Sequence, residues 1–144
     1  MRNKHGYSLI ELLIVIFTTS MLIYSGIELV NFKRQYEYKF FAKSLYLAIH
    51  QISINAISSN KDIAVSHEGD TIFYRTPDFE QIKLIDIPKD ITIKFKFSAV
   101  QKEGAQAMFY ASGVKSPGKI EITRGNDFCN IVIGLRNNAK LICD

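Results

Sequence analysis

The chain has 144 residues, of which 47% are hydrophobic and 22% are charged, a composition typical of one folded domain with a substantial core. Two cysteines are too few for a disulfide-dense mini-fold or for a cysteine-rich zinc module. The formal net charge of +4, from 18 basic and 14 acidic residues, is below the charge density expected of a dedicated nucleic-acid-binding protein.

The apolar residues gather in one long run near the N-terminus. Between Leu9 and Val30 the only charged residues are Glu11 and Glu28. As a helix this run is about 33 Å long, close to the ~30 Å hydrocarbon thickness of a bilayer. We predict a membrane-spanning helix rather than a cleaved secretory signal, because the run is too long and no small-x-small cleavage site follows it. Four hydroxyl residues in the run can bond back to helix carbonyls: Thr18, Thr19, Ser20 and Ser25.

A short basic segment, 1–6, precedes the run and favours a cytoplasmic N-terminus, with the bulk of the chain on the other side of the membrane. Glu11 is unusual, because a carboxylate near the centre of a membrane helix costs about 2.5–3.5 kcal/mol, although less near an end. Two interpretations stay open: the carboxylate reaches the lipid–water interface, or it meets a positive partner in the bilayer. A chain cut before Tyr7 would supply such a positive group four residues from Glu11.

The segment from Gly6 to Val15, GYSLIELLIV, resembles the class III leader junction of type IV pilins and pseudopilins. The resemblance implies that a prepilin peptidase of the membrane cuts between Gly6 and Tyr7, and that the new N-terminus of Tyr7 is methylated. It also implies that Glu11 pairs with the N-terminus of a neighbouring subunit during assembly. Many major pilins have a proline in the middle of this helix, and this sequence lacks it.

The helix is predicted to continue beyond the membrane run, from Ser8 to Ser58. One face of its second half carries apolar residues spaced by four, four, three and four: Phe41, Leu45, Ile49, Ile52 and Ala56. After the turn cluster 58–62 the pattern changes to the alternation of half-buried strands. Strands are expected at 91–97, Thr71–Arg75, Gln81–Ile87, Lys119–Thr123, Asn130–Ile133 and Ala139–Cys143. The pattern therefore predicts an α+β fold, in which the long N-terminal helix packs on an antiparallel β-sheet of six or seven strands. The resemblance implies that this fold is pilin-like.

We expect four parts: a leader peptide, 1–6; a transmembrane and assembly helix, 7–30; the amphipathic half of the helix, 31–58; and a β-rich globular domain, 59–144. The order of segments in the last two parts resembles the minor pseudopilins of the GspH/FimT type, and the ComGD-type pseudopilins of competence systems share much of it. FimT-type proteins often carry a Gly-Arg-x-Arg ending linked to DNA binding. The matching segment here, 134–140, departs from that ending and leaves Arg136 and Lys140 as candidate DNA contacts.

The resemblance implies a structural minor pilin or pseudopilin, whose partners are other pilin subunits, the prepilin peptidase, the membrane, and an inner-membrane assembly platform with its ATPase. Such a subunit is a single-pass inner-membrane protein with an extracytoplasmic domain until it enters a type IV pilus or a type II secretion pseudopilus. The alternative is a pilin-anchored receptor that binds DNA for uptake in competence. The eight basic against four acidic residues after Ile93 are a weak hint of DNA binding, and an ordinary solvated surface is the preferred explanation of this charge.

No enzymatic motif is present in the sequence: HExxH, the P-loop and GxGxxG are all missing. The three histidines are expected in the leader, on the helix and in a polar turn: His5, His50 and His67. We therefore expect no catalytic residue, no cofactor and no metal. The remaining metal hypothesis is a calcium ion held by Asn126, Asp127 and Asp144, whose spacing is nonspecific.

The only two cysteines of a domain expected outside the cytoplasm favour a disulfide, provided that they lie directly opposite each other on neighbouring strands. A two-residue loop in the last hairpin would set Cys143 opposite Val132. A five-residue loop, 134–138, instead sets Cys129 opposite Cys143 and keeps the apolar residues of both strands on one face. We predict the Cys129–Cys143 pairing, with two buried free thiols as the alternative.

Overall fold

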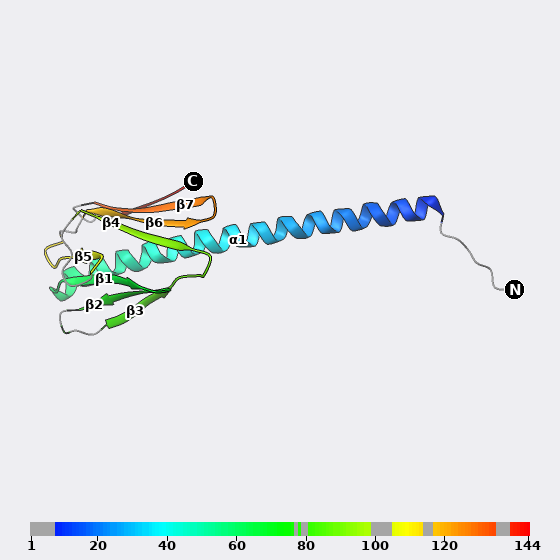
Figure 1. Cartoon of the computed structure of the whole chain (residues 1–144). Helices are drawn as coiled ribbons and strands as arrows, with labels where there is room; N and C mark the ends of the chain where they lie inside the picture. Colours follow the sequence, from blue (N-terminus) through cyan, green and yellow to red (C-terminus); the bar gives the residue numbers. More distant parts are fainter. Residues whose placement is uncertain (1–7, 77, 79–80, 99–104, 114–116, 135–138) are drawn as a thin grey trace. The chain divides into compact units, whose positions relative to one another are not determined.

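The computed structural model describes residues 8–76, 78, 81–98, 105–113, 117–134 and 139–144. Its first element is α1, Leu9–Ser59, a single α-helix of 51 residues (Figure 1). The helix predicted from Ser8 to Ser58 is therefore confirmed to within one residue at each end. It ends at Ser59, and the next residue, Asn60, has a left-handed φ of 53°. The amides of Asn60 and Lys61 donate to the carbonyls of Ile57 and Ala56, which closes the last turn as a Schellman motif.

The described strands form two four-stranded antiparallel sheets. Sheet A has the strand order β3-β2-β1-β5, and sheet B has the order β4-β6-β7-β8. The strands are β1 Ile63–Glu68, β2 Thr71–Arg75, β3 Gln81–Asp86, β4 Thr92–Phe97, β5 Ala107–Phe109, β6 Gly118–Arg124, β7 Asp127–Ile133 and β8 Ala139–Cys143.

The α+β, pilin-like fold class is confirmed. The predicted sheet differs from the structure in the number of strands and in the number of sheets. The described residues contain eight strands instead of six or seven, because β1 and β5 were missed. They also divide into two sheets. His67, expected in a polar turn, lies on β1, and its ring stacks on that of Phe95 from sheet B with the centroids 6.2 Å apart.

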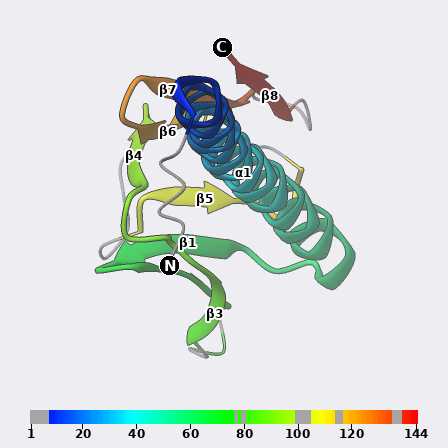
Figure 2. The ribbon, with the colours of Figure 1, turned by 90° about the vertical axis from the view of Figure 1, so that its right-hand side faces the viewer.

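The chain divides into two compact units, residues 1–37 and residues 38–144. In the first unit every described side chain, from Ser8 to Glu37, is exposed. In the second unit the remainder of α1 lies between the two sheets, and residues of both sheets share one apolar core with it (Figures 1 and 2). The helix contributes a buried stripe to this core: Tyr38, Phe41, Ala42, Leu45, Ile49, Ile52 and Ala56. The five stripe residues predicted from spacing are all buried.

Two tyrosines on this part of α1 fix its position along sheet B. The hydroxyl of Tyr38, which is 1% exposed, donates to the carbonyl of Ile122 on β6 at 2.8 Å. Eight residues later, the half-buried hydroxyl of Tyr46 donates to the carbonyl of Ala139 on β8 at 3.4 Å. Burial raises the pKa of Tyr38, and the nearby Asp127 charge raises it further. The buried phenol therefore stays neutral and keeps its proton for the bond to Ile122.

We expect Tyr38→Phe to lower the free energy of unfolding by about 1–2 kcal/mol, because it removes a hydrogen bond inside the core. Tyr46→Phe is the matched control and should cost less, since its bond is longer and half-buried. The measurement is denaturant unfolding of the full chain in an uncharged detergent. Equal losses for the two variants would contradict the anchoring role of Tyr38.

Candidate functional site

The first turn of α1 contains a capping box formed by Ser8 and Glu11. The backbone N–H of Ser8 donates to Oε2 of Glu11 at 2.9 Å, and the N–H of Ile10 donates to Oγ of Ser8 at 3.3 Å. Ser8 is therefore the N-cap and Glu11 the N3 residue. The sequence signal for this motif, Ser-x-x-Glu before an apolar run, is present but was not used in the sequence analysis.

The cleavage and methylation sites, Gly6 and Tyr7, lie outside the described residues. The structure shows Glu11 in contact with Ser8 of its own chain. The pairing of Glu11 with the N-terminus of a neighbouring subunit stays a prediction.

Among the described residues, α1 is the one helix that is long and apolar enough to cross a membrane, by length and composition. From Leu9 to Val30 its large apolar side chains are each more than half exposed, on all sides of the helix. The four hydroxyls in this stretch donate to carbonyls one turn back, as predicted: Thr18 to Ile14, Thr19 to Val15, Ser20 to Ile16 and Ser25 to Met21, at 2.7–2.9 Å. These four hydroxyls are thus satisfied within the helix, which lowers the cost of placing them in the interior of a bilayer.

The last hairpin has the register predicted from its loop length. Cys129 lies opposite Cys143, and Ile131 lies opposite Leu141. The two cysteines form a disulfide whose Cα atoms are 4.1 Å apart. Of the two candidate DNA contacts, Lys140 is exposed on β8, and Arg136 lies outside the described residues.

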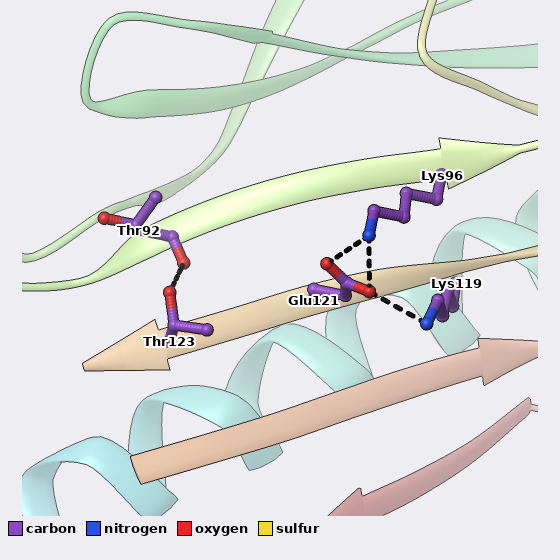
Figure 3. A network of polar contacts seen from close by, with 5 residues as sticks. All are labelled: Thr92, Lys96, Lys119, Glu121 and Thr123. Carbon is purple, nitrogen blue, oxygen red and sulfur yellow. Dashed lines mark hydrogen bonds and ion pairs between the residues drawn. The ribbon is translucent and has the colours of Figure 1, made fainter. Parts of the chain in front are cut away.

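Sheet B carries a buried carboxylate that the sequence analysis did not identify. Glu121 on β6 is 8% exposed, and its oxygens lie 2.8 Å from Nζ of both Lys96 on β4 and Lys119 on β6 (Figure 3). Hydrogen bonds from Lys119 and then Lys96 lower the pKa of Glu121 to about 2. Beside this cluster, Thr123 Oγ1 donates to the carbonyl of Thr92, a second link between the same two strands.

In the part of the chain that the structure describes, no group of three or more His, Cys, Asp or Glu side chains could hold a metal ion. The globular unit also has ion pairs at exposed positions, such as Lys61 with Asp78 and, within β3, Lys83 with Asp86.

The solved structures that resemble this chain include two of the minor pseudopilin EpsH from the type II secretion system of Vibrio cholerae. The first has a TM-score of 0.58 and 17% identity, and the match covers 74% of this chain and 93% of that one. The second has a TM-score of 0.54 and 18% identity, and covers 75% and 96%. No protein-family model and no curated protein matches the sequence. The chain therefore has the fold of a GspH-like minor pseudopilin.

The low pKa of Glu121 predicts a pH dependence of stability. In the unfolded chain this carboxyl has the ordinary pKa of 4.5, whereas in the folded chain the pKa is about 2. The contribution of the charged Glu121 side chain to the free energy of unfolding is complete above the pKa of the unfolded chain. It is lost as the pH falls from 4.5 towards 2. We therefore expect the difference in unfolding free energy between the unsubstituted chain and Glu121→Gln to shrink over this interval.

The comparison is made by denaturant unfolding at several pH values. Asp86→Asn is the control: hydrogen bonds from Lys83 also lower the pKa of Asp86, but at an exposed position, so its change should be smaller. A Glu121→Gln difference that stays constant with pH would contradict the assigned role of the two lysines.

Proposed function

We propose that the chain is a structural subunit, a minor pseudopilin that enters a type II secretion pseudopilus or a type IV pilus. One observation carries the proposal: α1 is continuous, yet its apolar residues before Tyr38 are all exposed, whereas from Tyr38 onward one stripe of them is buried in the core of a domain. The exposed apolar residues need an apolar environment. In this proposal, lipid provides that environment before assembly, and the helices of other subunits provide it afterwards. The likeness to EpsH supports this role at the level of the fold.

The proposal assigns a role to each part of the chain. Residues 1–6 are a leader removed by a prepilin peptidase, 7–30 anchor the subunit in the inner membrane, and 31–58 join this anchor to the globular domain, 59–144, outside the cytoplasm. An assembly platform and its ATPase then move the subunit from the membrane into the fibre. The role is structural and includes no catalytic step. A pilin-anchored DNA receptor would use the same anchor and fold, so the fold does not distinguish between the two functions.

The first test is processing. Co-expression with an active prepilin peptidase should shorten the chain by the six residues before Tyr7, and Gly6→Ala should block the cut because the peptidase recognises the residue before the bond. Intact mass spectrometry measures both outcomes. An unchanged mass beside an active peptidase would contradict the pilin assignment.

The second test separates the two roles of Glu11. Glu11→Ala and Glu11→Val remove both the charge and the bond to Ser8, whereas Glu11→Gln removes the charge and keeps an oxygen that can accept the Ser8 N–H. If the charge pairs with the N-terminus of a neighbour, all three variants should reach the membrane and fail to enter the fibre. The measurement is the fraction of the protein in sheared fibres relative to the membrane.

The glutamine variant decides the result. Normal incorporation of Glu11→Gln together with poor incorporation of Glu11→Ala would show that the cap, and not the charge, is needed. Normal incorporation of Glu11→Val would exclude both roles in assembly.

A further inference from the structure

The last strand, β8, is the least buried strand of sheet B. Among the described strands it pairs only with β7, so it forms an edge of the sheet, next to the C-terminus (Figure 2). None of its five residues, all of which the structure describes, is buried: Ala139 and Leu141 are half-buried and the others are exposed. Each other strand of the sheet contributes at least one buried residue, such as Ile93 on β4, Ile120 on β6 and Ile131 on β7. Apolar burial therefore stabilises β8 less than its neighbours.

The attachments of β8 to the rest of the globular unit are unequal. At one end the Cys129–Cys143 disulfide joins β8 to β7 covalently. At the other end the hydroxyl of Tyr46 donates to the carbonyl of the first residue of β8 at 3.4 Å. Between them lie the bonds of the β7–β8 ladder, and the amide of Asp144 donates to the carbonyl of Phe128. Hydrogen bonds at an exposed edge can be exchanged for bonds to water, so the disulfide is the attachment that solvent cannot replace.

The two sulfur atoms of the disulfide belong to residues of different accessibility. Cys129 is 0% exposed in the core, whereas Cys143 is exposed at the end of the edge strand. A thiolate that reduces a disulfide attacks one of its two sulfurs directly, so access decides which sulfur reacts. An external thiolate therefore reaches the sulfur of Cys143, and the sulfur of Cys129 is the leaving group.

We propose that the Cys129–Cys143 disulfide is a thiol-exchange site, at which an external dithiol attacks Cys143 and thereby releases β8 from sheet B. The attacking thiolate forms a bond to the sulfur of Cys143 while the S–S bond breaks. The electron pair of the broken bond stays on the sulfur of Cys129, which takes up a proton. The second thiol of the dithiol then displaces the sulfur of Cys143, which also takes up a proton. The dithiol ends as a disulfide and both cysteines end as thiols, after transfer of two electrons and two protons.

The release is local, because the rest of the globular unit keeps its core without β8. Ile120, Ile122 and Ile131 are 0% exposed and lie on β6 and β7. The hydroxyl of Tyr38 joins α1 to β6 through the carbonyl of Ile122. Reduction therefore leaves a three-stranded sheet B in which β7 is the new edge strand. The disulfide thus sets whether the edge of β7 is covered by β8 or open to another strand.

The experiment is hydrogen–deuterium exchange of the full chain in uncharged detergent, with and without dithiothreitol as the dithiol. After the quench both samples are fully reduced, so that mass spectrometry compares the same peptides. The amides of β8 should exchange faster in the chain that was reduced beforehand, by up to roughly 100-fold, because the bond closes a span of 14 residues. The amides that pair β4 with β6 should keep their exchange rates.

Two variants are the controls for this measurement. Cys129→Ala with Cys143→Ser lacks the disulfide, so its β8 should exchange fast without dithiothreitol and show no further response to it. Tyr46→Phe removes the hydrogen bond at the other end of β8 and keeps the disulfide. It should accelerate the exchange of β8 by only about fivefold and should still respond to dithiothreitol.

A second measurement identifies the sulfur that is attacked. The full chain is treated with limiting reduced glutathione, the free thiols are capped with N-ethylmaleimide, and peptide mapping locates both labels. Glutathione should be found on Cys143, and N-ethylmaleimide on Cys129, because Cys143 is the exposed residue of the pair.

Three outcomes overturn the proposal. Unchanged exchange of β8 after complete reduction would show that the ladder alone holds the strand. Equal acceleration in β4 and β6 would show that the bond stabilises the whole unit and releases no single strand. Glutathione found mainly on Cys129 would exclude attack at the exposed sulfur. None of these outcomes bears on the role of the chain as a fibre subunit, which the processing and Glu11 experiments test separately.

Discussion

The buried stripe of α1, from Tyr38 to Ala56, is the interaction on which the globular unit depends, because both sheets bury apolar residues against it. A four-stranded sheet with one apolar face needs a partner layer, and here one helix serves two sheets. The stripe alternates large residues such as Leu45 and Ile49 with Ala42 and Ala56, all 0–1% exposed, so the backbone of each sheet can approach the helix closely. Any change that rotates the helix would expose residues belonging to both sheets.

The same helix meets a different constraint before Tyr38. There its large apolar side chains are exposed, so its polar groups must be satisfied without help from a domain. Hydroxyls such as those of Thr19 and Ser25 bond to carbonyls of their own helix, and Ser8 and Glu11 cap its first turn. These hydroxyls and the capped first turn are thereby paired locally, which lowers the cost of placing them in lipid.

Local patterns in the sequence predicted most of the elements but not their assembly. Spacing of 3.6 residues identified the buried face of α1, and alternation identified strands such as β4. β5 was missed because three residues are too few to show a period, and β1 because its second half, Ser66–Glu68, is polar. Consecutive strands β3 and β4 belong to different sheets, which alternation alone does not reveal. The disulfide register could be predicted because β7 and β8 are joined by one short loop. The Glu121 cluster could not, because β4 and β6 are separated in the chain by β5, a strand of the other sheet.

The capping box offers a further reason why a carboxylate is found at position 11, near the start of an apolar helix. From the sequence, a carboxylate that is costly in lipid has two explanations: it reaches the lipid–water interface, or it meets a positive partner in the bilayer. In the structure its oxygen accepts the Ser8 N–H, at the end of the helix where the backbone dipole favours a negative charge. The hydrogen bond and the helix dipole both lower the free-energy cost of the Glu11 charge near the end of a membrane helix. The first turn is also where a long side chain reaches the lipid–water interface most easily. If the chain inserts in a membrane as proposed, this charge therefore needs no neighbouring subunit for insertion. A requirement for the charge in the fibre would then have to come from assembly itself, since Oε2 satisfies the helix terminus whether or not a second chain is present.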